Sequence, residues 1–175
     1  MLQNAVLIII VLVVAGGIVA TIAYHIVRFM RGSIKLSMPR TAFNPGDSIV
    51  GSFDLHTKKT IQGNKLIVSL IGTQVTKTYE DGKTRTRSHE IYRDEFLVEG
   101  PNTYAAGTAA RYNFEMPTPN TQSPEFMNST IGQALTTAFR LLNDRSTHLK
   151  WKLEARLDAQ GVDLATSQSI SLNIR

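Results

Sequence analysis

The sequence predicts an all-β domain, an antiparallel β-sandwich with one short inserted helix, that follows a single transmembrane α-helix. Two observations lead to this fold class. Residues Ala5 to Tyr24 form an apolar run without a charged side chain, and most later segments alternate apolar and polar residues with a period of two. We therefore divide the chain into an N-terminal anchor with its basic flank (residues 1–31) and a sandwich domain (residues 32–175), with the helical insertion at about residues 128–145.

The apolar run predicts a permanent membrane anchor. As a helix that rises about 1.5 Å per residue, Ala5 to Tyr24 spans roughly the 30 Å hydrocarbon core of a bilayer. A cleaved secretory signal is the alternative, but such a signal opens with basic residues and closes on a small-x-small site before a polar segment. No Lys or Arg precedes this run, and it continues into His25 and Ile26. We therefore expect the helix to be retained.

Charge on the two sides of the run predicts its orientation. Residues 1–4 carry only the terminal amine, whereas four basic residues follow the run, namely Arg28, Arg31, Lys35 and Arg40. Positive charge is retained on the cytoplasmic side of a membrane. We therefore expect a single-pass protein whose C-terminal domain is cytoplasmic.

Small residues form a patch within the run. Gly16 and Ala20 lie four residues apart, and Gly17 adjoins them. This spacing lets another transmembrane helix approach closely. Each Gly weakens a helix by about 1 kcal/mol relative to Ala, so packing explains two adjacent glycines better than chance does. We expect association with another helix, and chance occurrence is the alternative.

Seven segments of the domain alternate in the way that predicts strands with one face on a core. The clearest is His148 to Asp158, where every second residue is apolar and those between are charged. The core-facing positions in chain order are Ile34, Leu36 and Met38; Ile49, Gly51, Phe53 and Leu55; Leu66, Val68 and Leu70; Tyr92, Phe96 and Val98; Tyr112, Phe114 and Met116; Leu149, Trp151, Leu153, Ala155 and Leu157; Ile170, Leu172 and Ile174. Turn-forming residues separate these segments at Asn44–Asp47, Asp81–Gly82, Gly100–Asn102 and Gln160–Gly161. Two packed antiparallel sheets suit this pattern, and a closed barrel is the alternative.

A long polar hairpin is predicted from Thr73 to Tyr92, because Asp81-Gly82 favours a two-residue type I′ turn. The register that follows pairs Glu80 with Lys83, Tyr79 with Thr84, Thr78 with Arg85, Lys77 with Thr86 and Thr76 with Arg87. The hairpin would be locally basic through Lys77, Lys83, Arg85 and Arg87. These residues would contact anionic lipid headgroups or an acidic partner, each contributing about 1 kcal/mol near a charged membrane. The alternative is a solvated hairpin whose threonines favour strand.

A short amphipathic helix is predicted inside the insertion, capped by Asn128 or Ser129. Its apolar stripe consists of Ile131, Leu135, Ala138, Phe139 and Leu142. We expect this helix to close an open end of the sandwich. The alternative is a docking surface for a partner or the bilayer, with Ile131, Leu135 and Phe139 as contacts.

Motifs for catalysis and metal binding are missing from the sequence. It contains no Cys, its four His are scattered, and neither HExxH nor GxSxG occurs. The net charge of +5 falls once Arg28 and Arg31 are assigned to the membrane flank, which leaves 17 Lys and Arg against 14 Asp and Glu. Such a mixed charge pattern argues against nucleic-acid binding. We expect no catalytic, cofactor-binding or metal residues, no small-molecule substrate, and no enzymatic activity.

Several motifs, taken in order, resemble those of arrestin-like domains. They are Phe43 to Gly51 (FNPGDSIVG), Leu66 to Gly72 (LIVSLIG), Ala106 to Thr108 before Tyr112 to Pro117 (YNFEMP), Ser123 to Phe126 (SPEF), and Trp151 to Asp158 (WKLEARLD). The resemblance covers Ser33 to about Arg175. It implies an immunoglobulin-like sandwich used as a non-enzymatic adaptor or scaffold, as in arrestins, trafficking-related arrestin-like proteins and bacterial sporulation-control proteins. Members usually carry two such sandwiches and lack a transmembrane anchor, so their interdomain polar core is not carried over to this chain.

Three functional hypotheses follow from these patterns. The first is a membrane-anchored adaptor or accessory subunit that binds a membrane-protein complex through the span and the sandwich together. The second is a homo-oligomeric membrane scaffold, built from the small-residue patch and an exposed sheet edge. The third is a module that binds anionic lipid surfaces through Lys83, Arg85 and Arg87.

Overall fold

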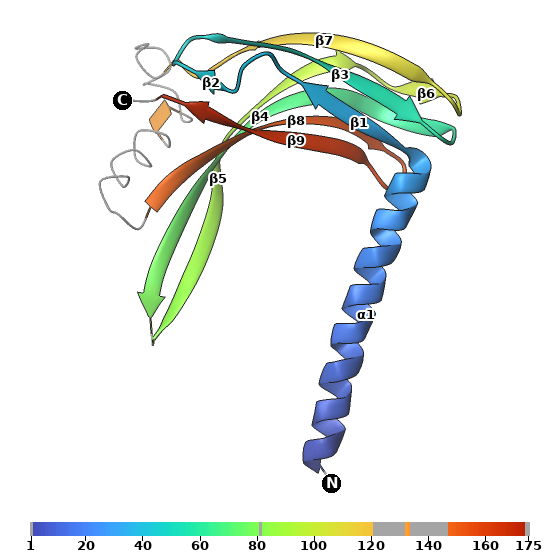
Figure 1. Cartoon of the computed structure of the whole chain (residues 1–175), viewed down its shortest axis with the longest axis vertical. Coiled ribbons are helices and arrows are strands. Elements are labelled where there is room, and N and C mark those ends of the chain that lie inside the picture. The colour runs from blue at the N-terminus through green and yellow to red at the C-terminus, as the bar shows by residue number, and fades with distance from the viewer. Residues whose placement is uncertain (1, 81, 121–131, 134–146, 174–175) are drawn as a thin grey trace.

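The computed structural model describes residues 2–80, 82–120, 132–133 and 147–173, and the side chains of α1 from Val13 onward. One helix is followed by nine strands in the described residues (Figure 1). The elements are α1 (Leu2–Arg31), β1 (Gly32–Ser37), β2 (Ala42–Phe43), β3 (Ser48–Thr57), β4 (Ile61–Glu80), β5 (Lys83–Glu99), β6 (Asn102–Tyr104), β7 (Ala109–Pro117), β8 (Thr147–Ala159) and β9 (Leu164–Leu172).

The strands form two sheets packed face to face. The smaller sheet has the order β1-β3-β7, and the six-stranded sheet has the order β2-β9-β8-β4-β5, with β6 pairing β4. All pairs are antiparallel except β2 with β9, which is parallel. The predicted strand-rich sandwich is therefore confirmed. The seven predicted segments omitted β2 and β6, which are too short to show an alternating pattern.

The core lies between the sheets and is filled by the residues that alternation selects. On β8, Trp151, Leu153, Ala155 and Leu157 are all buried. Trp151 packs against Tyr92 on the larger sheet, with ring centroids 5.4 Å apart, and Phe53 stacks on its ladder partner Tyr112 on the smaller sheet at 5.3 Å. Each pair lies within one sheet, and both pairs belong to the single apolar cluster between the sheets.

Among the predicted core positions that the structure describes, which exclude Ile174, one is exposed and six are partly buried, namely Leu36, Met38, Val98, Tyr112, Leu149 and Leu172. Phe96 is 38% exposed, although it pairs with buried Val68 and therefore points to the core side of the larger sheet. The reason is its place on β5, which forms the edge of that sheet. The same strand exposes Leu97 on its other face.

The outer face of β4 is also buried. Ile67, Ile71 and Val75 lie outside the core cluster yet are at most 4% exposed. Their neighbours across the ladder are long charged residues, such as Arg93 and Lys152 on either side of Ile71. The aliphatic stems of such side chains cover apolar surface while their charged ends form ion pairs, as Arg93 does with Glu90 at 2.8 Å.

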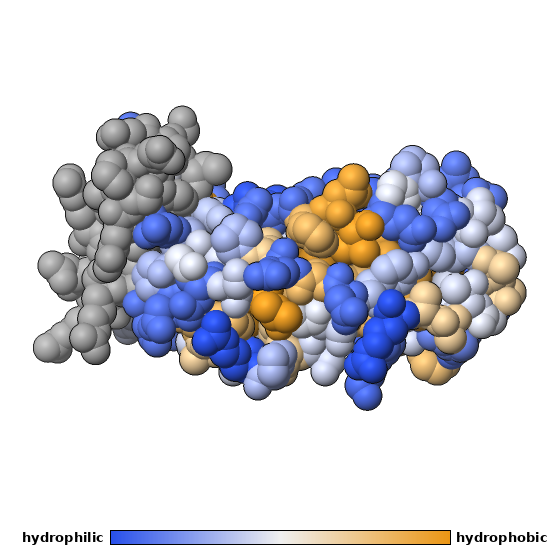
Figure 2. All heavy atoms as spheres, turned by 90° about the horizontal axis from the view of Figure 1, so that it is seen from above, coloured by the Kyte–Doolittle hydropathy of each residue, from blue (hydrophilic) through white to orange (hydrophobic). Residues whose placement is uncertain are grey.

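The helix α1 is 30 residues long and projects away from the sandwich, which it meets at its C-terminal end (Figure 1). Among its described side chains, Val13–Arg31 is long and apolar enough to cross a membrane, with a mean hydropathy of 1.7 and none of that stretch buried. The opposite side of the molecule, seen from above in Figure 2, is largely hydrophilic with a limited apolar area near its middle. The features with candidate functions lie on the helix side.

Candidate functional site

The junction between α1 and the sandwich has no linker. The helix ends at Arg31 and β1 begins at Gly32. Gly32 makes this change of direction with a φ of +153°, a region that residues with a Cβ rarely adopt. A Cβ at this position would also meet the backbone carbonyl oxygen of His56. Glycine is therefore required where the helix becomes a strand.

Two loops of the sandwich hold the end of α1. The Lys58 backbone N–H donates to the Arg31 carbonyl oxygen at 2.8 Å, and the Lys58 ammonium lies 3.5 Å from the centroid of the Phe29 ring. From the other side, the Arg31 guanidinium donates to the Gln160 carbonyl oxygen at 2.7 Å. Because Lys58 follows β3 and Gln160 follows β8, both sheets contribute to fixing the helix.

The sandwich is itself well braced next to this junction. Thr57 is fully buried, and its hydroxyl donates to the Ala105 carbonyl oxygen at 2.6 Å. Its backbone N–H donates to Thr108 at 2.9 Å, and its carbonyl oxygen accepts from Gly107 at 2.7 Å. The loop before β7 is thus tied to the end of β3, one residue from the loop that holds α1.

The polar hairpin is the second candidate feature. The predicted register is confirmed from Thr76 with Arg87 through Glu80 with Lys83. Strands β4 and β5 extend beyond the rest of the sandwich, and their tip projects on the same side as α1 (Figure 1). If α1 crosses a bilayer, the hairpin tip is directed toward that bilayer.

The register divides the predicted basic residues between two faces. Residues opposite each other in an antiparallel ladder share a face and neighbours in sequence alternate, so Lys83, Arg85 and Arg87 lie together with their partners Thr78 and Thr76. Lys77 lies on the other face with Tyr79, which is 75% exposed. All four basic side chains are exposed. The sequence prediction grouped all four residues as one basic site and did not note that Lys77 lies on the opposite face.

The face with three basic residues continues the core side of β4. The ladder with β8 runs without a shift from Leu66 to Thr76, so Thr76 and Thr78 point to the same side as Leu66 and Leu70. Beyond the sandwich, none of the described strands forms a second sheet over this side (Figure 1). Where the second sheet no longer covers this face, threonine and arginine stand in place of apolar residues. This polar composition explains why so long a hairpin is stable in water.

The small-residue patch lies on α1, away from the sandwich. Gly16, Gly17 and Ala20 are exposed, and a Cβ added at either glycine would have nothing within 4 Å. Tyr24 is 46% exposed, and Ala5 lies in the first part of the helix. This stretch of helix surface is therefore available to another helix.

The predicted inserted helix falls largely outside the described residues. Gly132 and Gln133 are helical. The three predicted contact residues, Ile131, Leu135 and Phe139, lie outside the described residues.

A cluster of two tyrosines and a glutamate is the most perturbed titratable group. The Tyr104 and Tyr112 hydroxyls both donate to Glu99 Oε2, at 2.8 and 3.0 Å, and Asn102 Nδ2 donates to Oε1 at 2.8 Å. Burial, then the hydrogen bond to Glu99, raises the pKa of both tyrosines. Each of these polar side chains has a hydrogen-bond partner within the cluster, as in a polar network that stabilises a fold. In the described part of the chain, no group of three His, Asp or Glu is placed to hold a metal ion.

The two packed sheets, preceded by one helix, match the arrestin-like fold of a solved structure. The structure is similar to that of the sporulation control protein Spo0M from Bacillus subtilis, with a TM-score of 0.54 and 16% sequence identity. The match covers 83% of this chain but 50% of that one, so the chain spans about half the length of this structural neighbour. At this identity the likeness shows the fold alone. No protein-family model matches the sequence, and no curated protein does.

Proposed function

We propose that this protein is a membrane-anchored, non-enzymatic adaptor, an accessory subunit that binds a membrane-protein complex through α1 and the sandwich together. The observation that carries this proposal is the linker-free junction at Arg31 and Gly32. A flexible tether would only keep the sandwich near the membrane. A fixed junction also restricts its orientation, which raises the effective concentration of one face for partners in the same membrane.

The exposed surface of α1 supports the partner being a membrane protein. Gly16, Gly17 and Ala20 give a small-residue surface free of contact with the sandwich. Such surfaces allow close packing between transmembrane helices, where dispersion contacts rather than the hydrophobic effect drive association. The partner would therefore meet α1 within the bilayer and the sandwich at its surface.

The fold supports a binding role rather than catalysis. The arrestin-like resemblance implies adaptor proteins, and the structural neighbour is a sporulation control protein. We place the sandwich on the cytoplasmic side, because Arg28, Arg31 and Lys35 follow the apolar run and no basic side chain precedes it. Protease added to sealed inside-out vesicles should digest the sandwich, whereas right-side-out vesicles should protect it.

The test is purification of the tagged full-length protein in a mild detergent, followed by native mass determination. The matched control carries a flexible Gly-Ser insertion between Arg31 and Gly32, which leaves both α1 and the sandwich intact. We expect a stoichiometric membrane-protein partner with the natural chain, and its loss or marked reduction with the insertion. A large assembly of this chain alone would instead favour the homo-oligomeric scaffold, and a bare monomer in gently solubilised membranes would contradict the adaptor proposal.

A second candidate function is contact between the hairpin and anionic lipids. It is favoured by the tip projecting on the helix side (Figure 1) and by the shared face of Lys83, Arg85 and Arg87. Charged side chains enter hydrocarbon only at a cost of several kcal/mol. The tip would therefore rest among the headgroups, and the helix would tilt to allow it, as transmembrane helices commonly do.

A further inference from the structure

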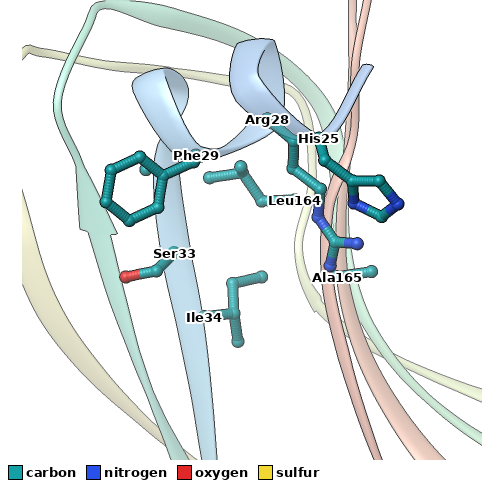
Figure 3. A pocket seen from close by; sticks show the side chains of 8 residues that line it. His25, Arg28, Phe29, Ser33, Ile34, Leu164 and Ala165 are labelled. Carbon is teal, nitrogen blue, oxygen red and sulfur yellow. The ribbon is translucent and has the colours of Figure 1, made fainter. Parts of the chain in front are cut away.

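A cavity lies where the last turns of α1 meet the sandwich (Figure 3). Its volume is about 310 Å³, at the small end of the range for ligand pockets. His25, Arg28 and Phe29 line it from the helix, Ser33 and Ile34 from β1, and Leu164 from β9. The adjoining ends of α1 and β1 thus build it together with the distant strand β9, and it depends on the junction holding the helix against the sandwich.

Arg28 is the distinctive side chain of this cavity. It is half-buried, and no hydrogen bond or ion pair joins it to any described residue. Other arginines near the two sheets have partners: Arg31 donates to Gln160 at 2.7 Å, Arg40 pairs with Asp47 at 3.4 Å, and Arg93 pairs with Glu90 at 2.8 Å. Partial burial of a guanidinium is costly when nothing compensates its charge. No described residue supplies a compensating anion to Arg28, so the geometry leaves room for one from a ligand.

The surroundings of Arg28 favour an anion. No carboxylate lines the cavity. Asp163, which precedes the lining residue Leu164, is occupied by Arg156 and by the Ala159 backbone N–H. His25, one turn before Arg28, adds a second group that can donate a hydrogen bond, and the Ser33 hydroxyl adds a third.

The cavity is also amphipathic. Figure 3 shows His25 and Arg28 on one side and Phe29 on the other, with Leu164 and Ile34 between them. A ligand with a charged head and an apolar body matches this division better than a free ion does. His25 directly follows Tyr24, the last residue of the predicted span. If α1 crosses the bilayer, the cavity therefore lies at the level of the lipid headgroups.

We propose that this cavity binds the phosphate of an anionic phospholipid headgroup. Arg28 supplies a two-pronged guanidinium for two phosphate oxygens, and His25 and Ser33 complete the set of donors. Phe29, Ile34 and Leu164 contact the glycerol and the start of the acyl chains. This assignment rests on the proposed membrane anchorage, and it makes the lipid a bridge between α1 and the sandwich.

The experiment is native mass spectrometry of the delipidated full-length protein in a non-ionic detergent, titrated with phosphatidic acid or phosphatidylcholine. We expect phosphatidic acid to bind the natural chain more tightly. Arg28→Gln should weaken that binding about tenfold, the size expected from one charge-assisted hydrogen-bonded contact. The affinity of Arg28→Lys for phosphatidic acid should lie between those of the natural chain and Arg28→Gln, because lysine keeps the charge but cannot donate two parallel hydrogen bonds.

Lys59→Gln is the matched control. Lys59 is exposed, and its backbone N–H lies 3.4 Å from the Arg31 carbonyl oxygen, so the change removes one charge near the same end of α1 but outside the cavity. Equal weakening by Lys59→Gln and Arg28→Gln would overturn the site, since it would mean general charge attraction. Full competition by glycerol 3-phosphate or inorganic phosphate would overturn the lipid assignment in favour of a free phosphate. Alkaline extraction of membranes separately tests anchorage, so failure of the anchor and failure of the cavity give different results.

Discussion

The Arg31 guanidinium donates a hydrogen bond to the carbonyl oxygen of Gln160, 2.7 Å away and 129 positions later in the chain. Arg31 is the last residue of α1, and Gln160 begins the turn between β8 and β9. A bond between these positions limits how far the helix can swing about the φ and ψ angles of Gly32. The hydrogen bond therefore fixes the angle between α1 and the sandwich at the point where the helix becomes a strand.

Arg31→Gln should loosen this angle while leaving the sandwich folded. The lost bond is partly exposed, so we expect the free energy of unfolding to fall by about 1 kcal/mol or less. The spread of helix orientations should widen, measured by spin-label distances between α1 and the sandwich. An unchanged spread would mean that Gly32 and Lys58 fix the junction without Arg31.

Gly32→Ala should destabilise the domain strongly. The substitution forces a residue with a Cβ into a φ of +153° and against the carbonyl oxygen of His56. We expect a loss of at least about 2 kcal/mol in the free energy of unfolding, followed in urea by the fluorescence of Trp151, the single tryptophan. Gly100→Ala is the control, because Gly100 has no positive φ and nothing near its Cβ position. Equal effects of the two substitutions would show that the junction is not strained by a side chain.

Alkaline pH should destabilise the sandwich partly through Tyr92. Burial, and secondarily the Asp94 carboxylate, raises the pKa of Tyr92 to about 12, whereas an unfolded tyrosine titrates near pH 10. The folded-state pKa is the higher one, so the unfolded chain loses its proton first, and stability falls as pH rises from about 10 to about 12. The urea midpoint of the Tyr92→Phe variant should fall less steeply with rising pH over this window. An identical slope would show that Tyr92 ionises as freely in the folded protein as in the unfolded one.

Hairpin charges should set the depth of the tip at an anionic bilayer. The chain has no cysteine, so a nitroxide on Thr84→Cys reports this position alone. Replacing Lys83, Arg85 and Arg87 by Gln should move the label away from anionic nanodiscs and have little effect in zwitterionic ones, since each charge contributes about 1 kcal/mol. Arg87→Gln and Lys77→Gln form a matched pair that each remove one charge, on opposite faces. If both shift the label equally, the face of Lys83, Arg85 and Arg87 has no special role.

Patterns of short range made much of the fold predictable. Alternation selected the buried side of β8, and the Asp81-Gly82 dipeptide set the hairpin register, consistent with the φ of +73° at Gly82. Strands β2 and β6 were missed because two or three residues carry no periodicity. The outer face of β4 was missed because Ile67 and Ile71 are covered by side chains of β5 and β8, a contact that depends on pairing rather than on local sequence.

The candidate site was less predictable, because it depends on geometry between distant segments. The sequence marked Arg28 as one of several flanking charges, but it did not indicate that Arg31 would bond to Gln160 while no described residue would pair with Arg28. It marked Gly32 only as a residue before the first strand. The cavity needs Leu164 beside His25, which no pattern along the chain could indicate.

The central claim is that α1 and the sandwich form one fixed unit in the membrane. The most direct test is the spin-label distance between Ile22→Cys on α1 and Ser169→Cys on β9, two exposed positions, in lipid nanodiscs. The account predicts a single narrow distance distribution for the natural junction, and a broad one when a flexible Gly-Ser insertion separates Arg31 from Gly32. A distance distribution for the natural chain as broad as that of the insertion variant would contradict the claim.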